Sequence, residues 1–121
     1  MILVDSSVWV DHLRGGDAGL ADLLQSGDVL AHPFVVGELA CGDLRARDEI
    51  LGLLRDLPQA KPASDDEALA FIARHRLMAR GIGYIDVHLL ASAALSQARL
   101  WTRDKRLGAV AGELALSLPR P

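Results

Sequence analysis

The chain has 121 residues, half of them hydrophobic, and its 13 basic and 16 acidic side chains give a net charge of −3. This length and composition predict one domain over residues 1–121 and exclude a disordered protein, and the negative balance argues against a nucleic-acid binder that relies on bulk charge. A single cysteine, Cys41, excludes an internal disulfide and a cysteine-rich zinc site, and we expect it to be a small buried hydrophobic residue. Because the first residues form neither a basic leader nor a long apolar run, we expect a soluble cytoplasmic protein without a membrane segment.

Short apolar runs alternate with helical patterns in the first half of the chain. A buried strand is predicted over Ile2–Val4, followed by helices from about Val8 to Arg14 and over Gly19–Ser26. A second strand is predicted over Val29–Ala31, followed by a helix that has Pro33 in its first turn and runs to about Cys41, and by a helix over Asp43–Asp56. The strands are too short and too apolar to be exposed on one face, which is typical of a parallel sheet buried between helices.

The second half of the chain continues this alternation. Ser64 and Glu67 have the spacing of a capping box, and the helix they begin is expected to reach Arg80. The remaining predicted elements are a break at Gly81-Ile82-Gly83, a helix over Tyr84–Ser96, a strand over Leu100–Thr102, a short helix capped by Asp104 and a closing strand over Leu114–Leu118. Strands that alternate with helices in this way predict an α/β domain with three layers and a mainly parallel central sheet.

Three acidic residues lie where a ligand site is expected in such a fold. Asp5 directly follows the first strand, Asp104 follows the Leu100–Thr102 strand, and Asp86 begins the helix after the glycine-rich break. Ligands of open parallel sheets bind beyond the carboxyl ends of the strands, where loops and helix N-termini converge. Taken singly, each of these residues is explained equally well as a helix N-cap.

Glu38 is not explained by capping. It lies within its helix on the same face as Phe34, Val35 and Cys41, so we expect its side chain to be buried. A buried carboxylate has to take up a proton, pair with a cation or bind a metal, because an unpaired buried charge costs several kcal/mol. Asp86 shares the pattern of an acid on an apolar helix face, and the two residues therefore suggest a common centre.

If Asp5, Glu38, Asp86 and Asp104 meet, their mutual repulsion requires a counter-charge. Carboxylate ligands without paired histidines or cysteines select Mg²⁺ or Mn²⁺, and Mg²⁺ takes its remaining ligands from water and from substrate phosphate. The hypothesis is hydrolysis of a phosphodiester by metal-activated water, leaving a 5′-phosphate and a 3′-hydroxyl. The hydroxyls of Thr102 and of Ser6 or Ser7 are candidates for holding a water or a phosphate oxygen.

The four acids lie in four distinctive segments: Leu3-Val4-Asp5-Ser6-Ser7-Val8-Trp9, Val36-Gly37-Glu38-Leu39, Gly81 to Ala93, and Leu100-Trp101-Thr102-Arg103-Asp104. Together these segments resemble the PIN-domain ribonucleases, in particular the VapC-type toxins of bacterial toxin-antitoxin pairs. The resemblance implies that Asp5, Glu38, Asp86 and Asp104 carry Mg²⁺ or Mn²⁺, and that Ser6 and Thr102 are the hydroxyl residues of the site. It also implies an RNA substrate, a homodimer and an inhibitory VapB-type antitoxin that places a basic side chain in the acidic pocket.

Basic residues dominate the segment 74–106, whereas residues 1–40 hold six acids against Arg14. Candidate contacts to RNA phosphates are Arg74, Arg76, Arg80, Arg103, Lys105 and Arg106, and the alternative is that these side chains are simply solvated. His88, two residues beyond Asp86 on a helix, is expected to point away from the centre and to pack rather than catalyse.

Three alternatives come from other functional classes. A phosphoacceptor receiver domain has this length and layering, but it carries adjacent acids after the first strand, where this chain has Ser6 and Ser7. A phosphatase of the haloacid-dehalogenase type would have an acid in place of Ser7. The third alternative is a non-catalytic RNA-binding module with the same fold, against which the presence of all four acids argues.

Overall fold

Three short apolar runs form the central sheet. The computed structural model describes residues 1–118, in which β1 (Ile2–Val4), β2 (Val29–Leu30) and β3 (Arg99–Trp101) lie in the order β2-β1-β3. Both neighbours run parallel to β1, and Leu3 is in register with Leu30 on one side and with Leu100 on the other. The predicted parallel sheet of an α/β fold is confirmed, and it places the ends of β1 and β3 side by side.

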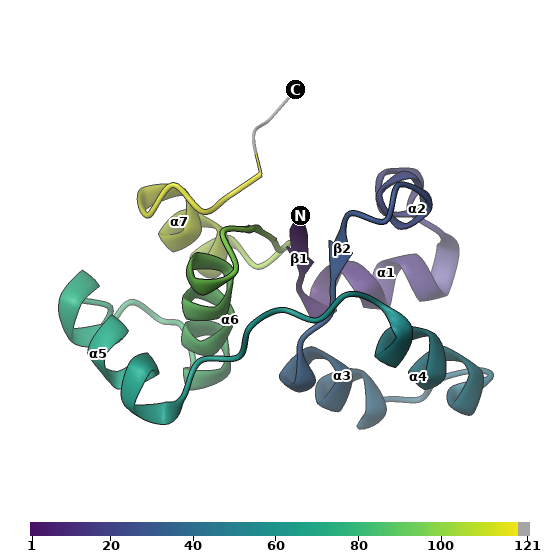
Figure 1. Cartoon of the computed structure of the whole chain (residues 1–121), viewed down its shortest axis with the longest axis horizontal. Helices are drawn as coiled ribbons and strands as arrows, with labels where there is room; N and C mark the ends of the chain where they lie inside the picture. The colour runs from purple at the N-terminus through teal and green to yellow at the C-terminus, as the bar shows by residue number, and fades with distance from the viewer. Residues whose placement is uncertain (119–121) are drawn as a thin grey trace.

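Helices cover the sheet on both sides. Within residues 1–118 they are α1 (Ser6–Gly15), α2 (Ala18–Gln25), α3 (Pro33–Ala40), α4 (Arg47–Asp56), α5 (Asp65–His75), α6 (Tyr84–Leu95) and α7 (Lys105–Glu113). Figure 1 shows α5, α6 and α7 to one side of the strands and α1 to α4 to the other. None of these helices has the length and apolarity needed to span a bilayer.

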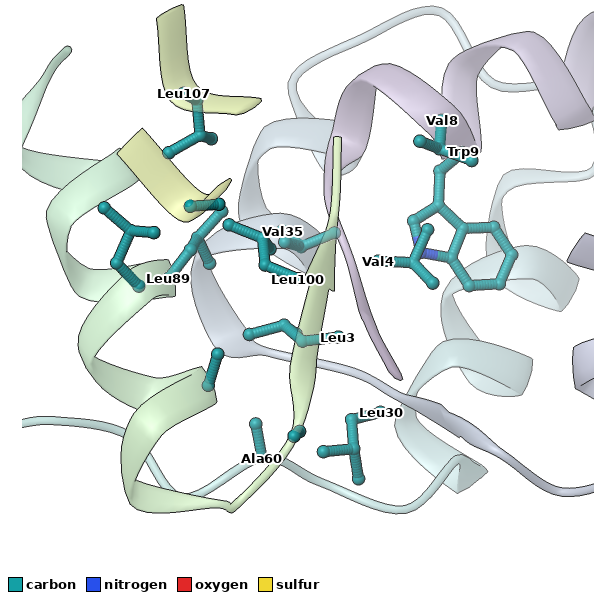
Figure 2. Packing of buried hydrophobic residues seen from close by; sticks show 14 of the residues in the cluster. Leu3, Val4, Val8, Trp9, Leu30, Val35, Ala60, Leu89, Leu100 and Leu107 are labelled. Atoms are coloured by element: carbon teal, nitrogen blue, oxygen red, sulfur yellow. The ribbon is translucent and has the colours of Figure 1, made fainter. Parts of the chain in front are cut away.

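The core is built from side chains that alternate across the strands. Leu3 and Val4 are completely buried and point to opposite faces of the sheet, as successive residues of a strand do. Figure 2 shows Val4 beside Trp9 of α1, whereas Leu3 points toward α6, where Leu89 lies. Apolar layers on both faces hold β1 in the centre, so the residue that follows it, Asp5, has a fixed position.

Three predicted boundaries are wrong, and each differs for a backbone reason. The helix expected from Asp43 begins at Arg47, because Ala46 has a left-handed φ of 51°. The helix expected to reach Arg80 ends at His75, because Arg76 has a φ of 55° that turns Leu77 into the core. The closing strand over Leu114–Leu118 is reduced to a single parallel bridge between Leu100 and Ser117, because a turn with φ 57° at Ala115 leaves only the end extended.

The prediction that Cys41 is buried is also wrong. Cys41 is the C-cap of α3, and its side chain is exposed because the last turn of α3 lies at the surface.

The other end of α3 is buried, and its N-cap is a residue that no sequence pattern singled out. His32 is 1% exposed, its Nδ1 accepts a hydrogen bond from the backbone N–H of Phe34 (3.0 Å), and its Nε2 lies 3.1 Å from Oγ of Ser92 on α6.

These bonds determine the tautomer of His32. Because Nδ1 accepts the bond that caps α3, the ring proton is on Nε2 and is donated to Ser92. Burial, with a smaller effect of nearby His88, lowers the pKa of His32 from its usual 6.5 to about 4. Protonation would therefore both charge a buried ring and remove the acceptor that caps the helix.

We expect the stability of the protein to fall as the pH drops from 6.5 toward about 4, the interval between the unfolded and folded pKa values of His32. The stabilising contribution of the neutral ring is complete above this interval, and its loss costs on the order of 3 kcal/mol. Urea unfolding at several pH values measures this loss. His32→Asn keeps a good cap without the titrating ring and should show a flatter pH dependence, whereas equal pH dependence in both proteins would assign the acid sensitivity to other groups.

Candidate active site

Asp5 is the best-fixed acid of the proposed centre. It follows β1, is 6% exposed, and is the N-cap of α1, with Oδ1 accepting from the backbone N–H of Ser6 (2.8 Å). Its other oxygen, Oδ2, accepts from Oγ1 of Thr102 (2.7 Å) and from Oγ of Ser7 (2.8 Å). Both carboxylate oxygens thus have donors, and a carboxylate held in this way is fixed in orientation.

The same hydroxyls join the end of β3 to the end of β1. Thr102 Oγ1 accepts from the backbone N–H of Asp104 (3.1 Å), and Ser7 Oγ accepts from the backbone N–H of Arg103 (3.0 Å). Asp104 is exposed and caps α7 through Oδ1, which accepts from the N–H of Leu107 (2.9 Å). The sequence suggested either Ser6 or Ser7 as a hydroxyl of the site. The Ser7 hydroxyl makes a shorter hydrogen bond to Asp5 (2.8 Å) than the Ser6 hydroxyl does (3.5 Å). The position of Ser7 two residues after Asp5 is the sequence feature that could have indicated this contact.

Glu38 reaches the centre from α3. Ser6 donates from Oγ to Glu38 Oε1 (3.2 Å), which brings the α3 acid next to the residue that follows Asp5. The prediction that Glu38 is buried is wrong: its side chain is exposed, because it lines an open groove between α1 and α3, and Phe34, one turn earlier, is 39% exposed. Partial burial still raises the pKa of Glu38, and the charges of Asp5 and Asp86 raise it further, against the opposing hydrogen bond from Ser6.

Asp86 occupies the first turn of α6 and faces the same centre. Its Oδ2 accepts from the backbone N–H of Gly83 (3.0 Å), so Asp86 closes the start of its own helix. The N-cap is Gly83, and Asp86 is the third helical residue of the capping box rather than the N-cap. Burial raises the pKa of Asp86 more than the Gly83 bond lowers it, and the charges of Asp5 and Asp104 raise it as well. The four acids therefore influence one another electrostatically although they come from four separate elements.

The side chains as they stand are near one another without converging on a single point. Within residues 1–118, no three histidine, cysteine, aspartate or glutamate side chains are arranged so that together they could hold a metal ion. Their chemistry nevertheless fits a hard divalent cation, because all the donors are carboxylate oxygens. Burial is the main reason that the pKa values of Glu38 and Asp86 are raised, and the negative charges of the neighbouring acids add to it. The arrangement is an acidic site that a cation would stabilise.

A charge-neutral substitution tests that electrostatic description. Glu38→Gln is expected to raise the melting temperature of metal-free protein by about 3 °C, because it removes one of the repelling charges while an amide oxygen can still accept from Ser6. Differential scanning calorimetry in chelator measures the shift. Glu49→Gln is the matched control, because Glu49 lies in the first turn of α4 and its charge favours the helix dipole. A marked drop for Glu38→Gln would instead identify Glu38 as a paired structural acid.

The candidate RNA-contacting residues lie in different surroundings. Arg103 pairs with Asp11 and Asp17, and Arg80 pairs with Glu113 at 2.7 Å. The Arg106 side chain packs over Gly81. Arg74 lies beside an apolar hollow between α5 and α6, Arg76 is the C-cap of α5, and Lys105 begins α7 next to Asp104. Arg103 and Lys105 flank Asp104 in the sequence, and the other four basic residues come from other segments. Contacts between RNA and these six residues stay a prediction.

His88 packs rather than faces the acids, as predicted. It is 3% exposed, its ring meets those of Phe34 and Tyr84 edge-on with centroids 4.9 and 4.6 Å apart, and its Nε2 lies 3.2 Å from Asp65 Oδ1. Tyr84 donates to the same carboxylate oxygen at 2.6 Å, and this bond is the main reason that the pKa of Tyr84 rises to about 12. The cluster ties the starts of α5 and α6 together and thereby supports the turn that carries Asp86.

Comparison with known proteins agrees with this geometry. The family model of the PIN domain matches residues 2–113, a range that includes all four acids. Ribonuclease VapC32 of Mycobacterium tuberculosis strain H37Rv is 49% identical over 119 residues, which cover 98% of this chain and 96% of that protein. Ribonuclease VapC32 of strain CDC 1551 matches with the same identity and coverage.

Proposed function

Since the chain belongs to the PIN-domain family, we propose that it is a metal-dependent endoribonuclease that hydrolyses phosphodiester bonds in RNA. The observation that carries the proposal is the fixed carboxylate of Asp5, bonded to Thr102 and Ser7 at the junction of β1 and β3. The pKa values of Glu38 and Asp86 are raised by burial and further by the nearby charge of Asp5. Such clusters of perturbed acids at strand ends are typical of active sites in α/β folds.

Asp5, Glu38, Asp86 and Asp104 are the residues that would hold Mg²⁺ or Mn²⁺ in this proposal. When bound, the ion supplies Lewis-acid polarisation of the phosphate and a water activated for attack at neutral pH. The hydroxyls of Thr102 and Ser7 keep Asp5 in one orientation, and Ser6 does the same for Glu38. Preorganisation of these oxygens means that little reorganisation is needed when charge develops during the reaction.

The reaction is an in-line hydrolysis. The water oxygen forms a bond to phosphorus, the bond between phosphorus and the 3′ oxygen breaks, and that oxygen takes up a proton, leaving a 5′-phosphate and a 3′-hydroxyl. Incubation of the purified chain with RNA and Mg²⁺ or Mn²⁺, followed by chemical mapping of the new ends, tests the proposal. A 2′,3′-cyclic phosphate product would contradict it, because that product requires attack by the ribose hydroxyl. A complete lack of cleavage would favour the non-catalytic RNA-binding alternative.

By likeness to the VapC32 proteins, we further propose that the chain acts as the toxin of a pair, in the cytoplasm, as a homodimer neutralised by a VapB-type antitoxin. The cluster of acids, in which Asp5 and Asp104 lie close enough to Asp86 to affect its pKa, supports this, because a guanidinium supplied by a partner would offset the same charge as a metal ion. Expression of the chain with and without the neighbouring gene tests it: growth arrest and RNA cleavage are expected only without the partner. Membership of the PIN-domain family removes the receiver-like alternative.

A further inference from the structure

A groove opens directly beside the acidic centre. It has a volume of about 540 Å³ and runs between α1, α3 and the segment that leads from α3 into α4, which lie on the same side of the strands in Figure 1. Ser6 and Glu38 line the end nearest the centre. Apolar side chains from both helices, from the connecting segment and from α4 form much of its wall: Val10, Leu13, Leu39, Leu44 and Ile50. The groove is therefore continuous with the site at which cleavage is proposed.

Two guanidinium groups stand at this groove. Arg14, in the last turn of α1, and Arg45, in the segment before α4, both line it and both are exposed. In the part of the chain that the structure describes, neither forms a salt bridge with a carboxylate, whereas Arg80 and Arg103 do. Positive charge available to an anion thus lies next to Glu38, outside the basic segment 74–106 that the charge distribution singles out.

We propose that this groove binds the single-stranded RNA flanking the cleaved bond, with Arg14 and Arg45 contacting its phosphates. The inference rests on the proposed ribonuclease function and names the surface that positions the substrate for it. A centre of four acids repels phosphate, so the binding energy has to come from neighbouring groups that attract the strand. A groove with apolar walls and cationic edges matches a strand that carries unstacked bases on one side and phosphates on the other.

The observations favour RNA over a protein segment as the occupant. An apolar peptide would use the groove walls but would leave the positive charges of Arg14 and Arg45, which line the groove, without a partner. Asp43 also lines the groove, and its carboxylate should repel the same phosphates that the two arginines attract. The proposal therefore predicts that removal of the Asp43 charge strengthens RNA binding, whereas removal of either arginine weakens it.

The test measures RNA binding without cleavage. Fluorescence anisotropy with a short labelled single-stranded RNA, in chelator and over a range of salt concentrations, is applied to the full-length chain and to Arg14→Ala, Arg45→Ala and the double variant. Each arginine removed should weaken binding about 5-fold near 0.1 M salt and reduce the slope of log K against log salt by about 0.7, the value for one contact to a single-stranded phosphate. Asp43→Asn should tighten binding.

Matched variants separate this effect from a general loss of charge or fold. Arg55→Ala removes the same charge from the exposed last turn of α4, away from the groove, and should leave the salt slope unchanged. Arg14→Lys keeps the charge and should retain most of the binding. Melting temperatures confirm that each variant is folded, and with Mg²⁺ present the alanine variants should raise KM with little change in kcat.

The outcomes distinguish the inference from the function on which it rests. If the chain cleaves RNA but Arg14→Ala and Arg45→Ala behave like Arg55→Ala in both salt slope and KM, the groove does not bind the substrate and the inference is overturned while the function stands. If the chain neither binds nor cleaves RNA in any of these assays, the proposed function and the inference both fail.

Discussion

Replacement of Asp5 with asparagine is expected to lower the rate of RNA cleavage by on the order of 100-fold or more while the protein remains folded. The substitution removes the charge of the acid that is held most rigidly and leaves its size unchanged. Asparagine is also a good N-cap, so the bond from the Ser6 N–H can persist. The hydroxyls of Thr102 and Ser7, which donate to the carboxylate, can rotate to accept from the amide instead.

The measurement is the initial rate of cleavage of a labelled RNA, together with a melting curve for each protein. Asp22→Asn is the matched control, because Asp22 is an exposed acid on α2 and the charge change is the same. Its rate should equal that of the unmodified chain. Retention of most of the activity in Asp5→Asn, with a normal melting temperature, would remove Asp5 from the catalytic machinery and with it the observation on which the proposed function rests.

Removal of divalent metal is expected to reduce cleavage to the background rate, and addition of Mg²⁺ or Mn²⁺ in excess should restore it. The physical reason is electrostatic. A phosphate oxygen about 4 Å from one carboxylate is repelled by about 4 kcal/mol at an effective dielectric constant of about 20, and here four acids act together. Without a cation, the substrate phosphate is kept away from the oxygens that would position it.

A second readout does not depend on activity. Mg²⁺ or Mn²⁺ should raise the melting temperature of the unmodified chain in a concentration-dependent way, because a ligand that binds only the folded state stabilises it. The increase should be smaller for Asp5→Asn and for Glu38→Gln, which lack one negative charge of the site. Cleavage at an equal rate in chelator would refute metal dependence and reopen catalysis through the ribose 2′-hydroxyl, although His88 is buried against Asp65 and faces away from the acids.

Local patterns in the sequence were enough to predict the elements that carry the acids. The strand before Asp5, the cap at Asp104 and the capping box at Ser64 are each encoded within a few residues, and the structure confirms them. The same short range explains the errors at helix ends. A left-handed residue sets a helix boundary without any glycine or proline to mark the position, as Ala46 does at the start of α4 and Arg76 at the end of α5.

The PIN-domain assignment was already determined by the sequence, and the four acids were proposed from it as the site, because strand ends, caps and the four motifs are properties of short segments. Only the tertiary structure decided how exposed Glu38 is, that Arg103 pairs with Asp11 and Asp17, and that Arg14 and Arg45 line one groove beside Glu38. These features join residues far apart in the chain. They depend on how helices pack against the sheet and against one another, and the periodicity within a single helix does not encode that packing.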